Sequence, residues 1–390
     1  MLPSFIIPIL ITLPFHLDHN RIVIDARLQM SDGKLGRIKV WVDNGTPDMV
    51  ISERLARQLG VVTTYDSATG TTRAAPPKTL LIGRSQIALN PSARVEVEKG
   101  TTVGAGLEAD MNLPSSVLCQ YDVLIDYPQR QITFASPGSV HFGGTAAPAY
   151  INPENHLIQL AAALDSDRFN LALDVGTPVT FIADELFSKF VKAHPRWPAM
   201  VGAVGMANLW GLLDEPEWRL LKVRNLVYGT ISFPAVLAVS FPKDRLDYFQ
   251  KRAGIPTAGL MGAASLLGYR IGIDYTRGLV YFERITKSAL PDMDLVGITL
   301  RPAADGYTIL GVARFRGRLA APGVQKGDRL LKVNGQDVTA LTMGGVWSLL
   351  QGPPGEKKEL TLQRAGAIIT VTVATQCFLC DATETGLSQQ

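Results

Sequence analysis

Two aspartates in matching sequence contexts are the residues of this chain best suited to chemistry. Asp43 lies in the segment Val42–Pro47, and Asp174 lies in the similar segment Leu173–Pro178. Two carboxylates brought close together cannot both ionise easily, so such a pair shares one proton. The ionised member can take a proton from water, while the protonated member stabilises a developing oxyanion. If the fold brings the two copies together, the repeated motif supplies such a carboxylate pair, with one aspartate from each copy.

The chain around each aspartate also repeats. Apolar or alternating segments at Asn20–Leu28 and His156–Leu164 predict strands that lead through a polar turn into the aspartate strands. Downstream, Tyr121–Tyr127 has a counterpart in Tyr269–Tyr275, and a short apolar strand follows each. Self-similarity of this kind predicts a duplicated β-rich lobe with one aspartate in each copy.

This arrangement resembles the pepsin-like and retropepsin-like aspartic peptidases over roughly residues 16–286. The resemblance implies that Asp43 and Asp174 form the catalytic dyad. It also implies that the glycines let backbone amides approach the carboxylates, and that the threonine hydroxyls hydrogen-bond to the outer carboxylate oxygens. The supporting residues implied in this way are Asn44, Gly45, Thr46, Gly176 and Thr177.

The chain departs from the family pattern at several positions. Asn44 and Val175 stand where the family normally has a threonine that ties the two aspartate loops together. Asn44 keeps a donor and an acceptor, whereas the side chain of Val175 has neither. A hydrophobic–hydrophobic–Gly segment ends at Gly262 in lobe two, but its counterpart in lobe one ends at Pro114. These changes bear on turnover more than on the fold, because the apolar scaffold is intact.

The composition changes after the second lobe. Lys287–Asp292 reads as a linker, Tyr307–Val312 as a strand and Met343–Leu350 as a helix. The intervening run Leu319–Gly335 contains Gly-Asp-x-Leu-x-x-Val-Asn-Gly, whose glycines indicate tight turns around a buried strand. This pattern resembles a PDZ domain of the kind attached to bacterial proteases. An unrelated small β-barrel is the alternative.

The PDZ resemblance implies a groove in which a peptide adds as an extra strand beside a helix. We expect peptide contacts from the loop and strand that open the domain and from one face of the helix. These residues are Val296, Gly297, Ile298, Thr299, Leu300, Met343, Val346 and Leu350. The helix residues have the spacing of one face, but they could equally be plain core.

Composition favours a folded protein whose partners are polypeptides. The chain has 46% hydrophobic and 19% charged residues and a net charge of +3 over 390 residues. No block of lysine and arginine stands out, so nucleic acid is not an expected partner. Neither a cofactor nor a metal is expected. Cys377 and Cys380 lack two further zinc ligands, so we favour a local disulfide or two inert thiols.

The apolar amino-terminal segment Phe5–Phe15 allows two interpretations. It is too short and too rich in proline to span a bilayer, so no membrane span is expected. It is either a clipped export signal or an edge strand of lobe one. We expect export to the periplasm or the extracellular space, with a cytoplasmic location also open.

The expected fold is mainly β, with a two-lobed pepsin/retropepsin-like acid protease fold followed by a PDZ-like β-barrel with short helices. The expected boundaries are an apolar segment at 1–15, lobe one at 16–140, lobe two at 150–286, the PDZ domain at 294–374 and a polar tail at 375–390. The expected function is peptide-bond hydrolysis by a dyad-activated water, with a PDZ domain that binds polypeptide. The alternative is a catalytically degenerate peptide-binding protein that acts through its PDZ groove. A purely structural subunit fits least, because it leaves both aspartate turns unexplained.

Overall fold

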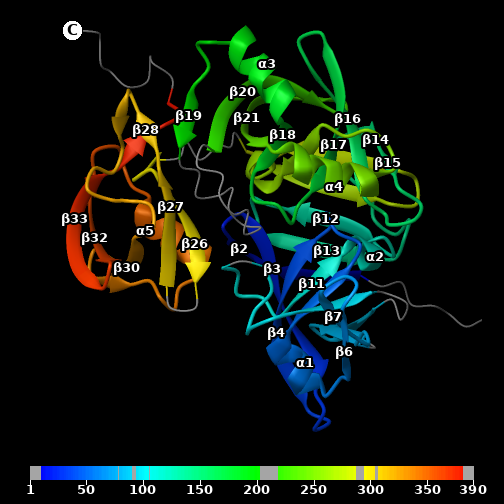
Figure 1. The fold of residues 1–390 in the computed structure, drawn as a ribbon. Coiled ribbons are helices and arrows are strands. Elements are labelled where there is room, and N and C mark those ends of the chain that lie inside the picture. Colours follow the sequence, from blue (N-terminus) through cyan, green and yellow to red (C-terminus); the bar gives the residue numbers. More distant parts are fainter. Residues whose placement is uncertain are drawn as a thin grey trace, which may run out of the picture.

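Two β-rich lobes and a C-terminal β domain make up the protein (Figure 1). The computed structural model describes residues 10–77, 79–89, 94–104, 106–202, 218–286, 294–303 and 306–380. The expected linker Lys287–Asp292 lies outside these ranges. Within them, no helix is both long and apolar enough to cross a membrane.

Lobe one consists of short strands and two helices. Helix α1 (Glu53–Leu59) begins where the Ser52 hydroxyl accepts a hydrogen bond from the Leu55 amide, and it ends at Gly60 in the left-handed conformation. Helix α2 is Ser115–Leu118. The strands are β1 (Leu10–Pro14), β2 (His16–Asp18), β3 (Arg21–Gln29), β4 (Leu35–Asp43), β5 (Met49–Ser52), β6 (Thr63–Asp66), β7 (Thr71–Ala74), β8 (Thr79–Ile82), β9 (Ser85–Ala88), β10 (Val95–Glu98), β11 (Met111–Pro114), β12 (Asp122–Asp126) and β13 (Gln131–Ala135).

Lobe two repeats this plan with longer strands. Its helices are α3 (Asp184–Ala193), α4 (Lys243–Ala253) and the 3₁₀ helix η2 (Ala263–Ser265). Its strands are β14 (Thr145–Pro148), β15 (Tyr150–Ile151), β16 (Ile158–Leu164), β17 (Asp167–Asp174), β18 (Thr180–Ala183), β19 (Ala199–Gly202), β20 (Trp218–Tyr228), β21 (Ile231–Phe241), β22 (Gly259–Gly262), β23 (Tyr269–Asp274) and β24 (Leu279–Arg284).

The C-terminal domain contains helix α5 (Met343–Leu350) and a sheet in the order β26-β27-β30-β32-β33. Its strands are β25 (Asp294–Leu295), β26 (Ile298–Ala303), β27 (Gly306–Val312), β28 (Arg314–Phe315), β29 (Arg318–Leu319), β30 (Arg329–Val333), β31 (Gln336–Asp337), β32 (Lys357–Arg364), β33 (Ala367–Ala374) and β34 (Gln376–Cys377). The bounds of α5 agree with those expected from the sequence, and β27 begins one residue before the expected strand.

A six-stranded sheet joins the two lobes and explains the downstream repeat. Its order is β1-β13-β12-β23-β24-β14, so each lobe supplies three strands. The central strands β12 and β23 are antiparallel, with Leu124 opposite Gly272. Strand β1 pairs with β13 in lobe one as β14 pairs with β24 in lobe two. The described part of the amino-terminal apolar segment, Leu10–Pro14, is therefore an edge strand, while residues 1–9 lie outside the described ranges.

The two aspartate strands have the same register in both lobes. Strand β4 runs parallel to β11 with Asp43 opposite Pro114, and β17 runs parallel to β22 with Asp174 opposite Gly262. A Cβ at Gly262 would overlap the backbone carbonyl of Val179, so this position needs glycine. Lobe one keeps the same pairing with proline at the strand end. The same strand pairing beneath each aspartate loop is thus present in both lobes, despite the missing glycine in lobe one.

The C-terminal domain shares a hydrophobic core with lobe two. Buried Phe181 and Val239 of lobe two belong to the same cluster as Leu300 and Val346 of the C-terminal domain. The sheet of lobe two also continues into this domain, because β19 pairs with β28. The two parts are therefore packed together rather than merely tethered.

The expected polar tail from residue 375 is wrong for its first residues. Strand β34 pairs with β25, and Phe378 and Leu379 are 4% and 1% exposed. Cys377 and Cys380 form a disulfide. The physical reason is hydrophobic burial, because Phe378 and Leu379 pack into the core shared with lobe two. Residues 381–390 lie outside the described ranges.

Candidate active site

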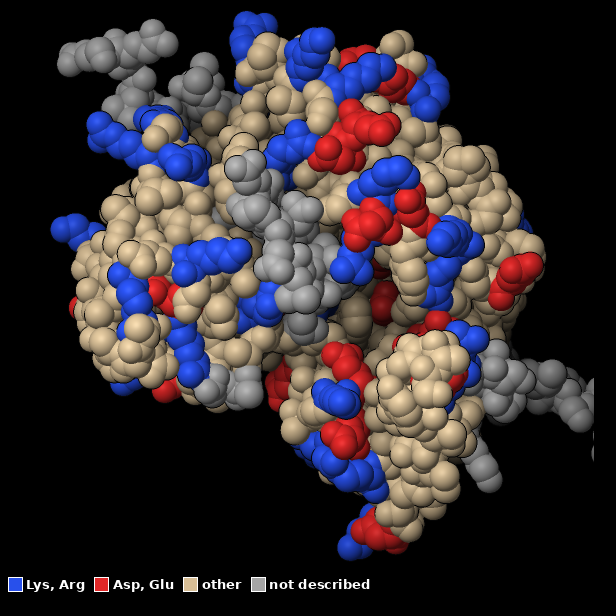
Figure 2. Space-filling view, viewed as in Figure 1, with Lys and Arg blue, Asp and Glu red and all other residues tan. Residues whose placement is uncertain are grey.

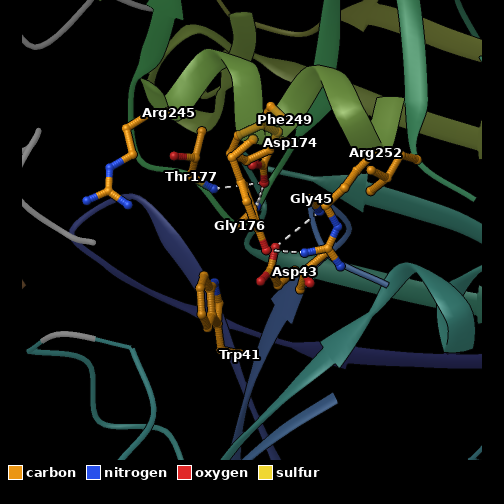
Figure 3. Close-up of a pocket in the computed structure, with 12 residues that line it drawn as sticks. Trp41, Asp43, Gly45, Asp174, Gly176, Thr177, Arg245, Phe249 and Arg252 are labelled. Atoms are coloured by element: carbon orange, nitrogen blue, oxygen red, sulfur yellow. Dashed lines mark hydrogen bonds between the residues drawn. The ribbon is translucent and has the colours of Figure 1, made fainter. Parts of the chain in front are cut away.

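The structure brings Asp43 and Asp174 together between the lobes (Figure 3). Asp43 is the last residue of β4, and Asp174 is the last residue of β17. Both residues are buried, with exposed fractions of 6% and 3%. A Cβ added to Gly45 would overlap the Asp174 carboxylate, and a Cβ added to Gly176 would overlap the Asp43 carboxylate. Each lobe therefore contributes a glycine that makes room for the aspartate of the other lobe.

Backbone amides hold the two carboxylates unequally. The Gly45 amide donates to Asp43 Oδ1 at 3.1 Å. The Gly176 and Thr177 amides both donate to Asp174 Oδ1, at 2.9 and 3.1 Å. Donors aimed at a carboxylate favour its ionised form, so these contacts favour Asp174 over Asp43 as the anion.

Burial changes the ionisation of both aspartates. Burial raises the pKa of Asp43 well above its ordinary value, and the nearby charge of Asp174 raises it further. Burial also raises the pKa of Asp174, to about 6, while the amides of Gly176 and Thr177 oppose that rise. Two buried carboxylates this close cannot both be charged cheaply, so the pair retains one proton at pH values between the two titrations.

Asn44 ties the two aspartate loops together. Its Nδ2 donates to the Leu173 carbonyl at 2.8 Å, and its Oδ1 accepts from the Val175 amide at 2.7 Å. Asn44 and Val175 are both buried, at 0% and 1% exposure. A single amide side chain in lobe one thus makes two bonds across the lobe boundary, and the Val175 side chain makes none because it has no polar atom.

Thr46 and Thr177 line the same cavity, but neither hydroxyl bonds to a carboxylate. Thr46 Oγ1 accepts from the Asp48 amide at 3.3 Å. Thr177 Oγ1 is buried and has no hydrogen-bond partner among the described residues. The hydrogen bonds to the outer oxygens that the resemblance implied are therefore absent from this part of the site, and Thr177 contributes through its backbone amide instead.

A cavity of about 240 Å³ adjoins the dyad, and helix α4 forms its roof (Figure 3). Viewed from outside, a hollow between the lobes contains acidic side chains (Figure 2). Arg252 of α4 bonds across to Asp48 of lobe one, with Nη2 and Oδ2 separated by 2.7 Å. Tyr248 also bonds to Arg252, which fixes the guanidinium from both sides. An ion pair thus connects helix α4 to lobe one.

Sequence reasoning missed six residues that line this cavity. They are Trp41, Leu157, Arg245, Tyr248, Phe249 and Arg252. Trp41 could have been found, because it lies two positions before Asp43 in the same strand and such positions share a face. The α4 residues gave no such signal, because nothing in the sequence motif connects this helix to the aspartates.

The residues expected to bind peptide in the C-terminal domain are covered by other parts of the chain that the structure describes. Val296, Ile298, Thr299, Leu300, Met343, Val346 and Leu350 are all buried, at 4% exposure or less. Gly297 has φ +75°, and a Cβ there would meet Phe378, Ala320 and Ala313. In this structure these residues belong to the core, which is the alternative that the sequence left open. The C-terminal segment covers the loop around Gly297.

Parts of the chain are similar to known proteins. Residues 320–364 match the family model of the PDZ domain. The C-terminal domain is a PDZ domain. Among solved structures, the chain is similar to the aspartic proteinase from Irpex lacteus, with 12% sequence identity and a TM-score of 0.41 over 72% of this chain and 99% of that chain. The search of curated proteins found no match.

The expected mainly β class and the C-terminal PDZ domain are confirmed. The PDZ domain follows two β-rich lobes that share one sheet. The features that identify the lobes are the shared six-stranded sheet and the matched registers of Asp43 and Asp174.

Proposed function

We propose that the chain is an aspartic-type endopeptidase in which Asp43 and Asp174 activate a water molecule between the lobes. The observation that carries the proposal is the reciprocal approach at the dyad, where Gly45 lies against Asp174 and Gly176 lies against Asp43. Such an arrangement excludes any side chain from both positions. It supports a pair of carboxylates that share one proton, which is the state this chemistry requires.

The two aspartates take different roles in this proposal. Asp174 accepts hydrogen bonds from two backbone amides and is the ionised member, so it takes a proton from the water. The water oxygen bonds to the peptide carbonyl carbon while protonated Asp43 gives its proton to the carbonyl oxygen. Transfer of the proton held by Asp174 to the amide nitrogen then lets the C–N bond break, and Asp43 recovers its proton as the carbonyl re-forms.

The bonds made by Asn44 support this reading. Because Asn44 reaches both the Leu173 carbonyl and the Val175 amide, it can hold the aspartate loops in register without the paired threonines of the family. Precise positioning of this kind is what acid–base catalysis needs from residues around the reacting groups.

A catalytically degenerate peptide-binding protein is the second candidate. The observation that favours it is the closed roof, because a cavity of about 240 Å³ is smaller than the roughly 300–1,000 Å³ of common ligand pockets. An extended peptide would need α4 to move away from lobe one, and in this alternative that movement does not occur.

Cleavage of a peptide library across pH separates the two candidates. The proposed peptidase cuts internal peptide bonds, and a statine-type transition-state analogue inhibits the cleavage. Intact peptides at every pH, from a protein whose folding is confirmed by circular dichroism, would favour the binding protein instead.

We also propose that the protein works in an oxidising compartment outside the cytoplasm. The Cys377–Cys380 disulfide supports this, since disulfides persist mainly in such compartments. Detection of the chain in periplasmic or secreted fractions would test it, and exclusive recovery with cytoplasmic markers would contradict it.

A further inference from the structure

Helix α5 of the PDZ domain docks on lobe one through its first two amides. The Met343 amide donates to the Gly106 carbonyl at 2.7 Å, and the Gly344 amide donates to Asp18 Oδ1 at 2.9 Å. The first amides of a helix have no partner within the helix, so lobe one satisfies two groups that would otherwise face solvent or a ligand.

The docked segment of lobe one lies where a peptide would enter the PDZ groove. A Cβ on Gly106 would lie 2.9 Å from Pro302 of β26 and 3.0 Å from Met343 of α5. Strand β26 is an edge strand of the PDZ sheet, and peptides add to such an edge beside a helix. The backbone of lobe one therefore lies between strand and helix and closes this end of the groove.

The opposite end of the groove is closed by the C-terminal segment. Leu295 pairs with Gln376, and Phe378 lies against the Gly297 position. Both ends are thus occupied by segments of the same chain. This explains why the residues expected to bind peptide are buried.

His19 is a buried titratable residue on the docked surface of lobe one. It is 5% exposed, and its ring lies 5.0 Å from the ring of Trp347 on α5. Neither Nδ1 nor Nε2 has a hydrogen-bond partner among the described residues. A buried imidazole without partners is already costly, and adding a charge to it in this position costs more.

The surrounding groups do not compensate a positive charge on His19. Asp18 is engaged by the Gly344 amide, and the buried cation Arg21 disfavours a second positive charge nearby. Helix α5 carries no titratable side chain, and the phenol of Tyr307 in the PDZ domain lies near Asp18 and Arg21. The titratable groups around the adjoining cavity of about 730 Å³ are His16, Asp18, His19, Lys39, Glu108 and Arg130.

We propose that lobe one closes the PDZ groove at neutral pH and that protonation of His19 releases it. Burial, and then Arg21, lower the pKa of His19 well below its ordinary value while the domain is docked. His19 lies in the turn of the hairpin formed by β2 and β3. When this hairpin is released the pKa of His19 returns to about 6.5, so the released state binds the proton more readily. Docking therefore weakens about tenfold per pH unit as the pH falls below about 6.5. The proposal rests on the PDZ domain and does not require an active dyad.

Hydrogen exchange of the Met343 and Gly344 amides in the full chain tests the proposal. Exchange is followed from about pH 7.5 to about pH 4.5 and corrected for intrinsic rates, with the amide of Leu124 in the interlobe sheet as a monitor of global unfolding. We expect the protection of both α5 amides to fall about tenfold per pH unit below about pH 6.5 while Leu124 stays protected.

Two variants remove the titrating group in different ways. His19→Asn suits the left-handed turn at φ 52°, and His19→Phe keeps a ring against Trp347. Both should show protection that no longer depends on pH. His16→Asn, an exposed histidine in the same hairpin, and Asp18→Asn should keep the pH dependence. Constant protection in the wild type would overturn the proposal, as would an unchanged pH dependence in both His19 variants or its loss in Asp18→Asn alone.

Discussion

At the scale of single residues, the reciprocal glycines define the candidate site. Neither Gly45 nor Gly176 has a positive φ, so the backbone itself tolerates a side chain, and only the opposing carboxylate excludes one. The need for glycine therefore comes from the other lobe. This separates a role in the dyad from a role in a turn.

Gly176→Ala should cost about 100-fold in kcat while leaving the fold intact, because the new methyl group displaces the Asp43 carboxylate from its position. Steady-state kinetics on a cleaved peptide measures the loss. Gly36→Ala is the matched control, since a Cβ there meets only the flexible Met30 side chain. Unchanged turnover in Gly176→Ala would show that the carboxylates need not approach each other.

Asp174→Asn should stabilise the fold at neutral pH. The pKa of Asp174 is raised to about 6 in the folded protein, so its ionisation penalises the folded state above that pH and not below the unfolded value of about 3.9. We expect a gain of roughly 1–3 kcal/mol at pH 7.5 and none at pH 3.5. Thermal unfolding at the two pH values measures it, and an equal effect at both would contradict the raised pKa.

Most dyad residues could be predicted from the sequence because their spacing repeats. Asp43, Asp174 and the two glycines follow from the duplicated motif alone. The sequence showed only that the Asn44 side chain has a hydrogen-bond donor and an acceptor. Its two hydrogen bonds across the lobe boundary could not be predicted, because their partners lie 129 and 131 positions away in the chain. The hydroxyl roles expected for Thr46 and Thr177 were wrong because the Asp48 amide and the backbone of Thr177 supply other contacts.

At the scale of elements, helix α4 was the main omission. Its surface is strongly polar, and only Ala253 is buried in it, so no apolar stripe announces a role in the site. Its position over the dyad follows from the pairing of β21 and β22 on either side of β18, which no local pattern encodes.

Arg252→Gln should open the roof, because it removes the ion pair between α4 and Asp48. We expect a several-fold higher kcat/KM for extended peptides and a loss of about 1 kcal/mol in stability. Lys243→Gln is the control, as it removes the same charge from an exposed pair on the same helix. A lower kcat/KM in Arg252→Gln would indicate instead that the latched helix binds substrate.

At the scale of the whole molecule, the duplication made the two lobes predictable from the sequence. It gave no information on how the PDZ domain docks on them. The repeat fixes which strands correspond, and the interlobe sheet follows from it. The contact between Asp18 and Gly344 spans 326 positions and involves no motif. The predicted polar tail was too long, because the polar residues 381–390 follow directly after the apolar pair Phe378 and Leu379.

The PDZ domain should depend on the C-terminal segment for stability. A fragment of residues 294–380 should be more stable than one of residues 294–374 by roughly 3–5 kcal/mol, because the shorter one lacks the buried side chains of Phe378 and Leu379. Urea unfolding of the two fragments gives the difference. Equal stability would show that this segment serves lobe two rather than the PDZ domain.

The most direct test of the central proposal is the rate of peptide cleavage by the wild type, Asp43→Asn and Asp174→Asn, measured on one library-selected peptide across pH. If the two carboxylates act as one shared-proton system, each variant should lose at least about 1,000-fold in kcat, and the double variant should lose little more. The wild-type rate should fall on the acid side as Asp174 becomes protonated near pH 6. Wild-type turnover in either folded variant would contradict a dyad made of Asp43 and Asp174.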